Sequence, residues 1–403
     1  MARLGRCLPF LLSGCLAVGC LAPGAAWAAP PPPADAASAP SVTADAAVLI
    51  DARTGRVLYA KAANTPRAPA STTKMMTALI ALEQGNPDAT VTVGRRAAAT
   101  PGSSAGLRAG ERYTLAALLR GLLLRSGNDA AVAIAEHVAG SVRDFAALMN
   151  ARAQALGLRN THFVNPHGLT EPFHYSSAYD LARIARAGLK LPAFAAIVDS
   201  ATAQISGYDR LQRAFHRELR NTNQLLLAYD WVDGVKTGTT RAAGNCLVAS
   251  GTRGGLRLIA VVLHSDHRWG DALQLLQWGF AHFSDRTLPA GAVVGRVAVR
   301  AAARRGASVA AVSAGALAVP VALSELPRTR LRLELPATLT APVRAGQVVG
   351  KAVLERAGEV LGQVPLVAGG FVARAPWYRR WWRRLWSRDG APQSTVRSAP
   401  PSQ

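Results

Sequence analysis

The sequence predicts an α+β fold in which a domain of helices around an antiparallel sheet is followed by an all-β sandwich. Apolar runs of helical length occupy much of residues 71–138, and apolar runs of strand length occupy residues 232–263. From about Ala290 the pattern changes to short alternating runs broken by proline and glycine, which is typical of a small β-domain. We therefore expect an antiparallel sheet flanked by helices, with a helical subdomain, before a separate β-sandwich.

The first 28 residues have the pattern of a secretory signal peptide. Two arginines precede an apolar run over residues 7–22, and Ala26-Trp27-Ala28 supplies a small-x-small cleavage site. Within this run, Leu12-Ser13-Gly14-Cys15 resembles the lipid-attachment box of bacterial lipoproteins, so a lipid on this cysteine is the alternative. An Ala/Pro-rich linker is expected to follow at residues 29–41.

The composition of the sequence limits the classes of partner expected for the exported chain. The formal net charge of the sequence is +22, but an exported protein does not meet nucleic acid, so we expect anionic lipid or acidic cell-wall polymer as the partner. After removal of the signal, Cys246 is the only cysteine, which excludes an internal disulfide. No later apolar run reaches the roughly 18–20 residues of a membrane span, so we expect a chain that is soluble or attached to a membrane surface.

The tetrad Ser71-Thr72-Thr73-Lys74 is the first candidate for chemistry. Two prolines lie just before it and no helix breaker follows for several residues, so a helix should begin here. Ser71 and Lys74 then share one helical face with Cβ atoms about 5–6 Å apart, which lets the lysine act as a general base. Only five of the 46 basic residues are lysine, and arginine cannot give up its proton in a protein. Taken alone, the tetrad is still better explained as a capped helix with a surface lysine.

Two further tripeptides lie at element boundaries. Residues 46–60 read as strand, turn and strand, and apolar helical runs follow at residues 115–124 and 130–138. Ser126-Gly127-Asn128 lies in the break between those two runs, where it would by itself be an ordinary turn. The strand expected at residues 232–239 contains Lys236-Thr237-Gly238. An edge strand with a lysine, a hydroxyl and a glycine lets a substrate backbone lie close alongside it.

Taken in order, Ser71-x-x-Lys74, Ser126-x-Asn128 and Lys236-Thr237-Gly238 match the three-part signature of penicillin-binding proteins and class A β-lactamases. Further segments resemble the D-alanyl-D-alanine carboxypeptidase family of low-molecular-mass penicillin-binding proteins, which are serine-type DD-peptidases: Asn165-Pro166-His167-Gly168-Leu169, Gly244-Asn245, and Arg268 ahead of an apolar helix. The similarity is firm over residues 42–285 and looser beyond. It implies a transpeptidase/β-lactamase-like catalytic domain over residues 42–285 and a C-terminal β-sandwich domain over residues 286–370.

The resemblance implies a role for each motif residue. Ser71 would be the nucleophile that forms an acyl-enzyme with a peptidoglycan pentapeptide stem, Lys74 would accept its proton, and Ser126 would relay that proton to the leaving D-alanine. The residues implied in substrate binding are Asn128, Lys236, Thr237, Gly238, Thr239 and Arg268. The backbone N–H groups of Ser71 and Thr239 would form the oxyanion hole. β-Lactam antibiotics should acylate the same serine, and no metal or cofactor is implied.

Residues 371–389 are expected to form an amphipathic membrane-anchoring helix. At about 100° per residue, one half-circle holds six aromatic or leucine side chains and the other half-circle holds four arginines. Such a helix suits the anionic surface of the inner membrane, and packing against a domain is the alternative. Residues 390–403 read as a disordered tail. We therefore expect an exported enzyme attached peripherally to the periplasmic face of the cytoplasmic membrane.

Three other functions stay open on the sequence. A DD-endopeptidase that cuts peptidoglycan cross-links would share the fold. A β-lactamase is disfavoured because Ser126-Gly127-Asn128 lacks the aspartate of the S-D-N form, and Glu171 is the only nearby candidate for a deacylating glutamate. A non-catalytic wall- or membrane-binding protein would need neither a nucleophile nor a base. Residues 102–106 also fit G-x-S-x-G, but no clear strand precedes them, which argues against an α/β-hydrolase.

Overall fold

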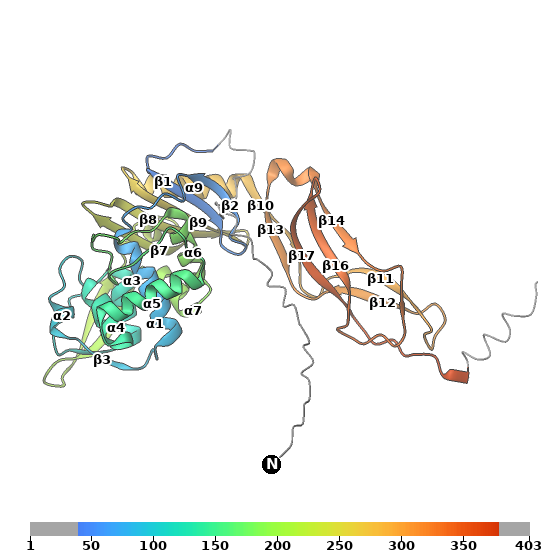
Figure 1. The fold of residues 1–403 in the computed structure, drawn as a ribbon, viewed down its shortest axis with the longest axis horizontal. Coiled ribbons are helices and arrows are strands. Elements are labelled where there is room, and N and C mark those ends of the chain that lie inside the picture. Colours follow the sequence, from blue (N-terminus) through green and yellow to red (C-terminus); the bar gives the residue numbers. More distant parts are fainter. Residues whose placement is uncertain (1–38, 379–403) are drawn as a thin grey trace, which may run out of the picture.

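The computed structural model describes residues 39–378, which form an α+β domain and a β-sandwich beside it (Figure 1). Both parts of the predicted fold class are therefore confirmed. The signal peptide expected at residues 1–28, most of the linker expected at residues 29–41, and everything after Tyr378 lie outside the described residues.

The α+β domain is built on a five-stranded antiparallel sheet. The strand order is β2-β1-β9-β8-β7, so that β7 lies at an edge. These strands are β1 (Ala46–Asp51), β2 (Val57–Lys61), β7 (Val232–Thr240), β8 (Gly244–Arg253) and β9 (Leu256–Ser265). Both faces of the sheet are covered: in β9, Ile259 and Val261 belong to one apolar core, whereas Leu258 and Ala260 belong to another. Because side chains on both faces of the sheet are buried, the strand sequences are almost continuously apolar.

Helices form the layers on the two faces of the sheet. The helix α9 (Arg268–His282) packs on one face, and the helical subdomain packs on the other (Figure 1). The helices of this second layer are α1 (Lys74–Gln84), α2 (Arg95–Ala98), α3 (Leu115–Leu124), α4 (Asn128–Ala139), α5 (Val142–Ala155), α6 (Ala178–Leu189) and α7 (Pro192–Asp199). Serine or threonine caps begin several of them: the Ser177 hydroxyl, for example, accepts a hydrogen bond from the N–H of Asp180 at the start of α6.

A small sheet and two short helical turns complete this domain. The sheet has the order β3-β4-β5-β6. Its strands are β3 (Thr90–Thr92), β4 (Arg112–Thr114), β5 (Thr202–Tyr208) and β6 (Ala214–Arg220). The 3-10 helix η2 (Ala70–Thr73) runs directly into α1, and α8 (Leu225–Ala228) precedes β7.

The C-terminal domain packs a two-stranded ribbon against a six-stranded sheet. The ribbon pairs β10 (Phe283–Leu288) with β13 (Leu317–Ala322), and the 3-10 helix η3 (Leu323–Arg328) follows it. The larger sheet has the order β14-β16-β17-β12-β11-β15. Its strands are β11 (Val293–Arg300), β12 (Ser308–Ser313), β14 (Thr329–Glu334), β15 (Thr338–Thr340), β16 (Val348–Arg356) and β17 (Glu359–Ala368). Valine, leucine and alanine side chains from both layers share one core, as expected for a sandwich.

The two domains are joined without a linker. Strand β10 begins at Phe283, immediately after α9, and Phe283 lies in the apolar core between α9 and the central sheet. Across the junction, Arg56 Nη1 donates a hydrogen bond of 2.7 Å to the carbonyl of Pro320, and Arg53 pairs with Asp285.

The helix expected to begin at residue 371 begins later. Val372 forms a β-bridge with Val343, and Arg374 forms one with Ala302. Residues 371–376 are therefore extended, because their backbone is held by the edge of the sandwich, and helical structure first appears at Trp377 and Tyr378. The rest of the expected amphipathic helix lies outside the described range. No helix within residues 39–378 is both long enough and apolar enough to cross a membrane.

Candidate active site

The turn that carries Ser71 places it next to Lys74. Ser71 lies in η2 and Lys74 is the first residue of α1, so the three-residue spacing puts both side chains on the same side of the turn. Lys74 Nζ forms hydrogen bonds of 2.8 Å with Ser71 Oγ and of 2.8 Å with the carbonyl oxygen of His167. Lys74 is fully buried, whereas Ser71 is partly exposed. A substrate can therefore reach the serine while the amine behind it stays dry.

The environment of Lys74 favours its neutral form. Burial, and then the nearby charge of Lys236, lower the pKa of Lys74 well below 10.5, and Asp129 opposes this shift only in part. Among residues 39–378 no carboxylate forms an ion pair with Lys74. A neutral amine at 2.8 Å from a hydroxyl can accept its proton.

The second motif lies between α3 and α4 and contains two buried polar atoms without partners. Ser126 is 5% exposed and has a φ of 59°, in the left-handed region that non-glycine residues seldom adopt. Neither Ser126 Oγ nor Asn128 Oδ1 has a hydrogen-bond partner within the described structure. Asn128 is held through its other side-chain atom, because Nδ2 donates a hydrogen bond of 2.6 Å to the carbonyl of Pro101. Buried polar atoms are rarely left unpaired, so these two are available to a ligand.

The third motif lies on the edge strand β7, as the sequence predicts. Lys236 is 1% exposed, and its Nζ donates a hydrogen bond of 2.9 Å to the carbonyl of Thr237. Burial, and then the charge of Arg268, lower the pKa of Lys236 to about 7. A Cβ atom on Gly238 would lie 3.1 Å from the backbone nitrogen of Ser71, so a side chain here would crowd the turn that carries Ser71.

Arg268 brings a second cation to this strand. It is the first residue of α9, and its Nη1 donates hydrogen bonds of 2.8 Å to Thr239 Oγ1 and of 3.2 Å to the carbonyl of Gly238. Neither Arg268 nor Lys236 forms an ion pair with any residue between 39 and 378. Two uncompensated cations beside an open strand edge form a suitable site for a carboxylate.

Thr222 links the end of α3, two residues before the second motif, to the third motif, and was missed in the sequence. Its N–H donates a hydrogen bond of 3.1 Å to the carbonyl of Leu124 at the end of α3. Its hydroxyl oxygen lies 2.7 Å from Thr237 Oγ1 on β7. The only signal was the run of hydrogen-bonding side chains in Asn221-Thr222-Asn223, which is also typical of an ordinary loop.

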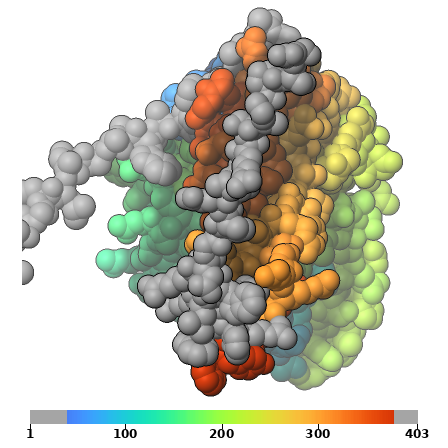
Figure 2. Space-filling model, turned by 90° about the vertical axis from the view of Figure 1, so that its right-hand side faces the viewer, coloured from blue at the N-terminus to red at the C-terminus, as the bar shows by residue number. Residues whose placement is uncertain are grey.

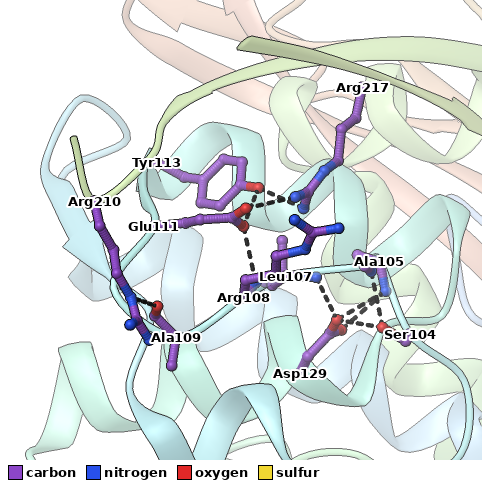
Figure 3. A network of polar contacts seen from close by, with 11 residues as sticks. Ser104, Ala105, Leu107, Arg108, Ala109, Glu111, Tyr113, Asp129, Arg210 and Arg217 are labelled. Atoms are coloured by element: carbon purple, nitrogen blue, oxygen red, sulfur yellow. Dashed lines mark hydrogen bonds and ion pairs between the residues drawn. The ribbon is translucent and has the colours of Figure 1, made fainter. Parts of the chain in front are cut away.

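Asp129 is a second residue that sequence reasoning missed. Its buried carboxylate accepts hydrogen bonds from the backbone N–H groups of Ala105 and Leu107, each at 3.0 Å, and from Ser104 Oγ (Figure 3). The G-x-S-x-G segment at residues 102–106 is therefore a loop held down by Asp129. Because Asn128 precedes Asp129 and bonds to Pro101, one short stretch of α4 fixes the whole loop.

A second polar cluster holds the other end of this loop. Arg217 on β6 donates hydrogen bonds of 2.6 Å to Glu111 Oε1 and of 2.6 Å to the hydroxyl of Tyr113 (Figure 3). Glu111 also accepts a hydrogen bond of 2.8 Å from the N–H of Arg108. Burial and the hydrogen bond to Glu111 raise the pKa of Tyr113. The loop beside the second motif is thus fixed at both ends by buried ionic groups.

Comparison with known proteins assigns both domains to families. Residues 34–267 match the family described as D-alanyl-D-alanine carboxypeptidase, and residues 284–374 match the family described as penicillin-binding protein 5, C-terminal domain.

Curated relatives match most of the chain. The D-alanyl-D-alanine carboxypeptidase DacF of Bacillus subtilis (strain 168) is 36% identical over 339 residues, which covers 81% of this chain and 85% of that protein. DacC of Escherichia coli (strain K12), also a D-alanyl-D-alanine carboxypeptidase, is 35% identical over 375 residues, covering 85% of this chain and 91% of that protein.

Solved structures agree with the sequence matches. Penicillin-binding protein 5 of Haemophilus influenzae aligns with a TM-score of 0.66 and 34% identity, covering 83% of this chain and 99% of that one. The resemblance seen in the three motifs is therefore confirmed, and the chain belongs to the D-alanyl-D-alanine carboxypeptidase family of penicillin-binding proteins.

Proposed function

We propose that this chain is a serine-type D-alanyl-D-alanine carboxypeptidase that removes the terminal D-alanine from peptidoglycan pentapeptide stems through an acyl-enzyme on Ser71. One observation carries the proposal: the oxygen of Ser71 lies 2.8 Å from a buried lysine amine whose pKa is well below its usual value. As a family member, the enzyme is a hydrolase of the cell wall that also binds β-lactams. A binding protein would have no use for such a pair.

Proton transfer begins at the hydrogen bond between Ser71 and Lys74. Lys74 takes the proton of Ser71 as its oxygen attacks the carbonyl of the last peptide bond, and the backbone N–H groups of Ser71 and Thr239 stabilise the oxyanion that forms. The proton then passes through Ser126 to the leaving D-alanine. Water next attacks the acyl-enzyme, and Lys74 again serves as the base. The unpaired oxygen of Ser126 is consistent with a group that gains its partners only when substrate is bound.

The charge of the site favours a substrate with a free C-terminus. Lys236 and Arg268 bind the terminal carboxylate, and Thr237 adds a hydroxyl donor. Asn128 and the open edge of β7, including Gly238, hold the substrate backbone. An internal peptide bond in a cross-link would not place a carboxylate next to the same groups, so removal of a terminal residue is favoured over cross-link cleavage.

The first test is mass spectrometry of purified muropeptides after incubation with the mature enzyme. Pentapeptide monomers should lose one alanine with the native enzyme and with Ser200→Ala, a control on α7's C-terminal side, and should be unchanged with Ser71→Ala. Conversion of cross-linked dimers to monomers would assign a DD-endopeptidase instead. Hydrolysis of penicillin without any change in either muropeptide would assign a β-lactamase.

We further propose that the enzyme is exported and held at the periplasmic face of the inner membrane. The support is the signal-peptide pattern at residues 1–28 and the aromatic and cationic pattern after Pro376. Truncation after Tyr378 keeps the extended segment that belongs to the sandwich and should release the mature enzyme from membranes. Continued sedimentation of the truncated enzyme with membranes in high salt, which weakens purely electrostatic binding, would point to a lipid on Cys15.

A further inference from the structure

Charge is unevenly distributed over the β-sandwich. All four carboxylates within residues 286–378 form ion pairs with Arg332, Lys351 or Arg356, at the edge formed by β14, β16 and β17. The opposite end carries six arginines and no carboxylate. We call this group the basic end: Arg296, Arg300, Arg304, Arg305, Arg344 and Arg374. None of the six forms an ion pair within residues 39–378.

The segments of the basic end are tied to one another by backbone contacts. The N–H of Ala341 donates a hydrogen bond of 2.9 Å to the carbonyl of Arg300, and that of Ala303 donates one of 3.0 Å to Ala373. Val343 forms a β-bridge with Val372. The six cations therefore come from neighbouring segments of one rigid edge, so their mutual repulsion must be offset by the fold or by a bound anion.

Three of these arginines surround a hollow. Arg296, Arg304, Arg305, Ser308 and Phe371 line a cavity of about 540 Å³, a size typical of small-ligand sites. Arg296 is fixed in place because its Nε donates a hydrogen bond of 3.0 Å to Ser308 Oγ. Phe371 is 67% exposed at the rim. A cationic hollow beside an exposed aromatic ring combines the two features of a protein surface that rests on an anionic bilayer.

The position of the basic end in the molecule supports a bilayer as its partner. Figure 2 shows the segment near residue 375 together with the segment around residue 300 at one end of the sandwich, and Figure 1 places that end away from the α+β domain. Trp377 and Tyr378, at the end of the described chain, are 73% and 48% exposed. The chain therefore leaves the sandwich beside the basic end, with aromatic side chains in the position where a membrane interface would accept them.

We propose that the basic end is a second membrane contact, in which Arg296, Arg304 and Arg305 bind the phosphate of an anionic lipid headgroup. This inference rests on the proposed location at a membrane surface, but it concerns different residues from the amphipathic helix. Two attachment points, one on the rigid sandwich and one on the following segment, fix the orientation of the enzyme and hold the α+β domain away from the bilayer.

The test is the binding of the full-length mature enzyme to vesicles of phosphatidylcholine, with and without phosphatidylglycerol, in low and high salt. Arg296→Gln, Arg304→Gln and Arg305→Gln are combined in one variant. The matched control combines Arg286→Gln, Arg328→Gln and Arg330→Gln, which removes the same charge from three exposed arginines elsewhere on the sandwich. Each arginine near an anionic bilayer is worth on the order of fivefold in affinity, so the first variant should bind phosphatidylglycerol vesicles about 100-fold more weakly.

Four outcomes decide the matter. The proposal is supported if the basic-end variant loses much more vesicle affinity than the control variant, and if hydrogen exchange at residues 301–307 slows only on anionic vesicles. Equal losses for the two variants overturn it, because net charge alone then explains binding. Unchanged binding of the basic-end variant, with release by truncation after Tyr378, also overturns it while the helix anchor stands. Full competition by millimolar inorganic phosphate would assign a free-anion site instead. Turnover of a soluble peptide by every variant shows separately whether the catalytic assignment holds.

Discussion

A Cβ atom on Gly168 would lie 1.8 Å from the carbonyl oxygen of Ala70. The backbone fixes the position of a Cβ atom and the carbonyl of Ala70 is itself backbone, so no side-chain rotation could relieve the overlap. The φ of Gly168 is +88°, which favours glycine. Gly168 follows His167, whose carbonyl binds Lys74, and Ala70 precedes Ser71. The loop that holds the base and the turn that carries the nucleophile are therefore in direct backbone contact.

Gly168→Ala should separate these two segments and slow acylation of Ser71. The carbonyl of His167 would move away from Lys74, and misplacement of about 1 Å near reacting groups can cost ~100-fold in rate. The measurement is the second-order rate of labelling by a fluorescent penicillin. Gly140→Ala is the matched control, since Gly140 has a φ of +76° but no atom within 4 Å of its added Cβ. It should lose about 1 kcal/mol of stability and keep its activity. Equal labelling rates for the two variants would refute the role of this contact.

Asp129→Asn should loosen the loop at residues 104–107 and also change the pH profile. In this variant a side-chain NH₂ group replaces the carboxylate oxygen that faces the N–H groups of Ala105 and Leu107. Those backbone donors therefore lose their acceptor. We expect a higher KM and faster hydrogen exchange in the loop. Because the charge of Asp129 raises the pKa of Lys74, its removal should also move the acidic limb of the acylation profile to lower pH.

This second readout separates an electrostatic role of Asp129 from a purely structural one. Asp144→Asn, at the exposed start of α5, is the control and should change neither KM nor the pH profile. If the acidic limb of Asp129→Asn stays where it is in the native enzyme, the electrostatic link between Asp129 and Lys74 is wrong. A loop that exchanges no faster would contradict the role of Asp129 in holding it.

The parts of the fold that follow from local sequence patterns were predictable. The apolar runs of β8 and β9 and the serine–lysine spacing depend on neighbours within a few residues, so a single sequence contains their signal. The order of the three motifs along the sequence then indicated the family. The start of the C-terminal helix was placed too early, at residue 371. Helical periodicity is a local pattern, so it contains no information on the long-range bridges from Val372 to Val343 and from Arg374 to Ala302.

The supporting groups of the candidate site could not be read from the sequence. Thr222 reaches Thr237 only because the chain after β6 passes the end of α3 and lies beside β7, and the carbonyl of His167 reaches Lys74 across 93 positions of the chain. Asp129 had one local signal, since it is an acidic residue directly before the apolar helical run at residues 130–138. The groups that donate hydrogen bonds to it are backbone N–H groups of an irregular loop, and these have no sequence signature.

Stability should fall in acid because His174 is buried in its neutral form. Its Nδ1 accepts a hydrogen bond of 3.1 Å from the N–H of Val164, so Nε2 carries the proton and donates to Thr73 Oγ1 at 2.9 Å. Burial lowers the pKa of His174 to about 4. Between the unfolded pKa of about 6.5 and this value the unfolded chain binds more protons, so the free energy of unfolding falls as the pH falls, by up to about 3 kcal/mol at pH 4.

His174→Gln tests this linkage, because glutamine can still donate to Thr73 but does not titrate. The measurement is the free energy of unfolding by urea from pH 7 to pH 4, and the native enzyme should show the steeper loss. His137→Gln, at an exposed position on α4, should follow the native curve. If His174→Gln shows the native pH dependence, other groups are responsible for the acid sensitivity.

Lys236 should make recognition of a carboxylate pH-dependent near neutrality. Its pKa is lowered to about 7 by burial and by the charge of Arg268, so the free enzyme loses this cation as the pH rises through 7. Acylation by benzylpenicillin, which has a carboxylate, is compared with acylation by its methyl ester, which has none. Both reactions need neutral Lys74, so the ratio of their rate constants cancels the base and reports the carboxylate site alone.

In the native enzyme this ratio should fall about tenfold from pH 6 to pH 9. A tenfold change corresponds to the loss of one charge-assisted hydrogen bond, at the lower end of the range for such bonds. Lys236→Arg should keep the ratio flat, because arginine stays charged throughout. Arg268→Ala should lower the ratio at every pH and move its decline to higher pH, because the loss of that positive charge raises the pKa of Lys236. A native ratio that does not change with pH would mean that Lys236 stays charged in the free enzyme. The carboxylate site would then have to be assigned to two permanent cations.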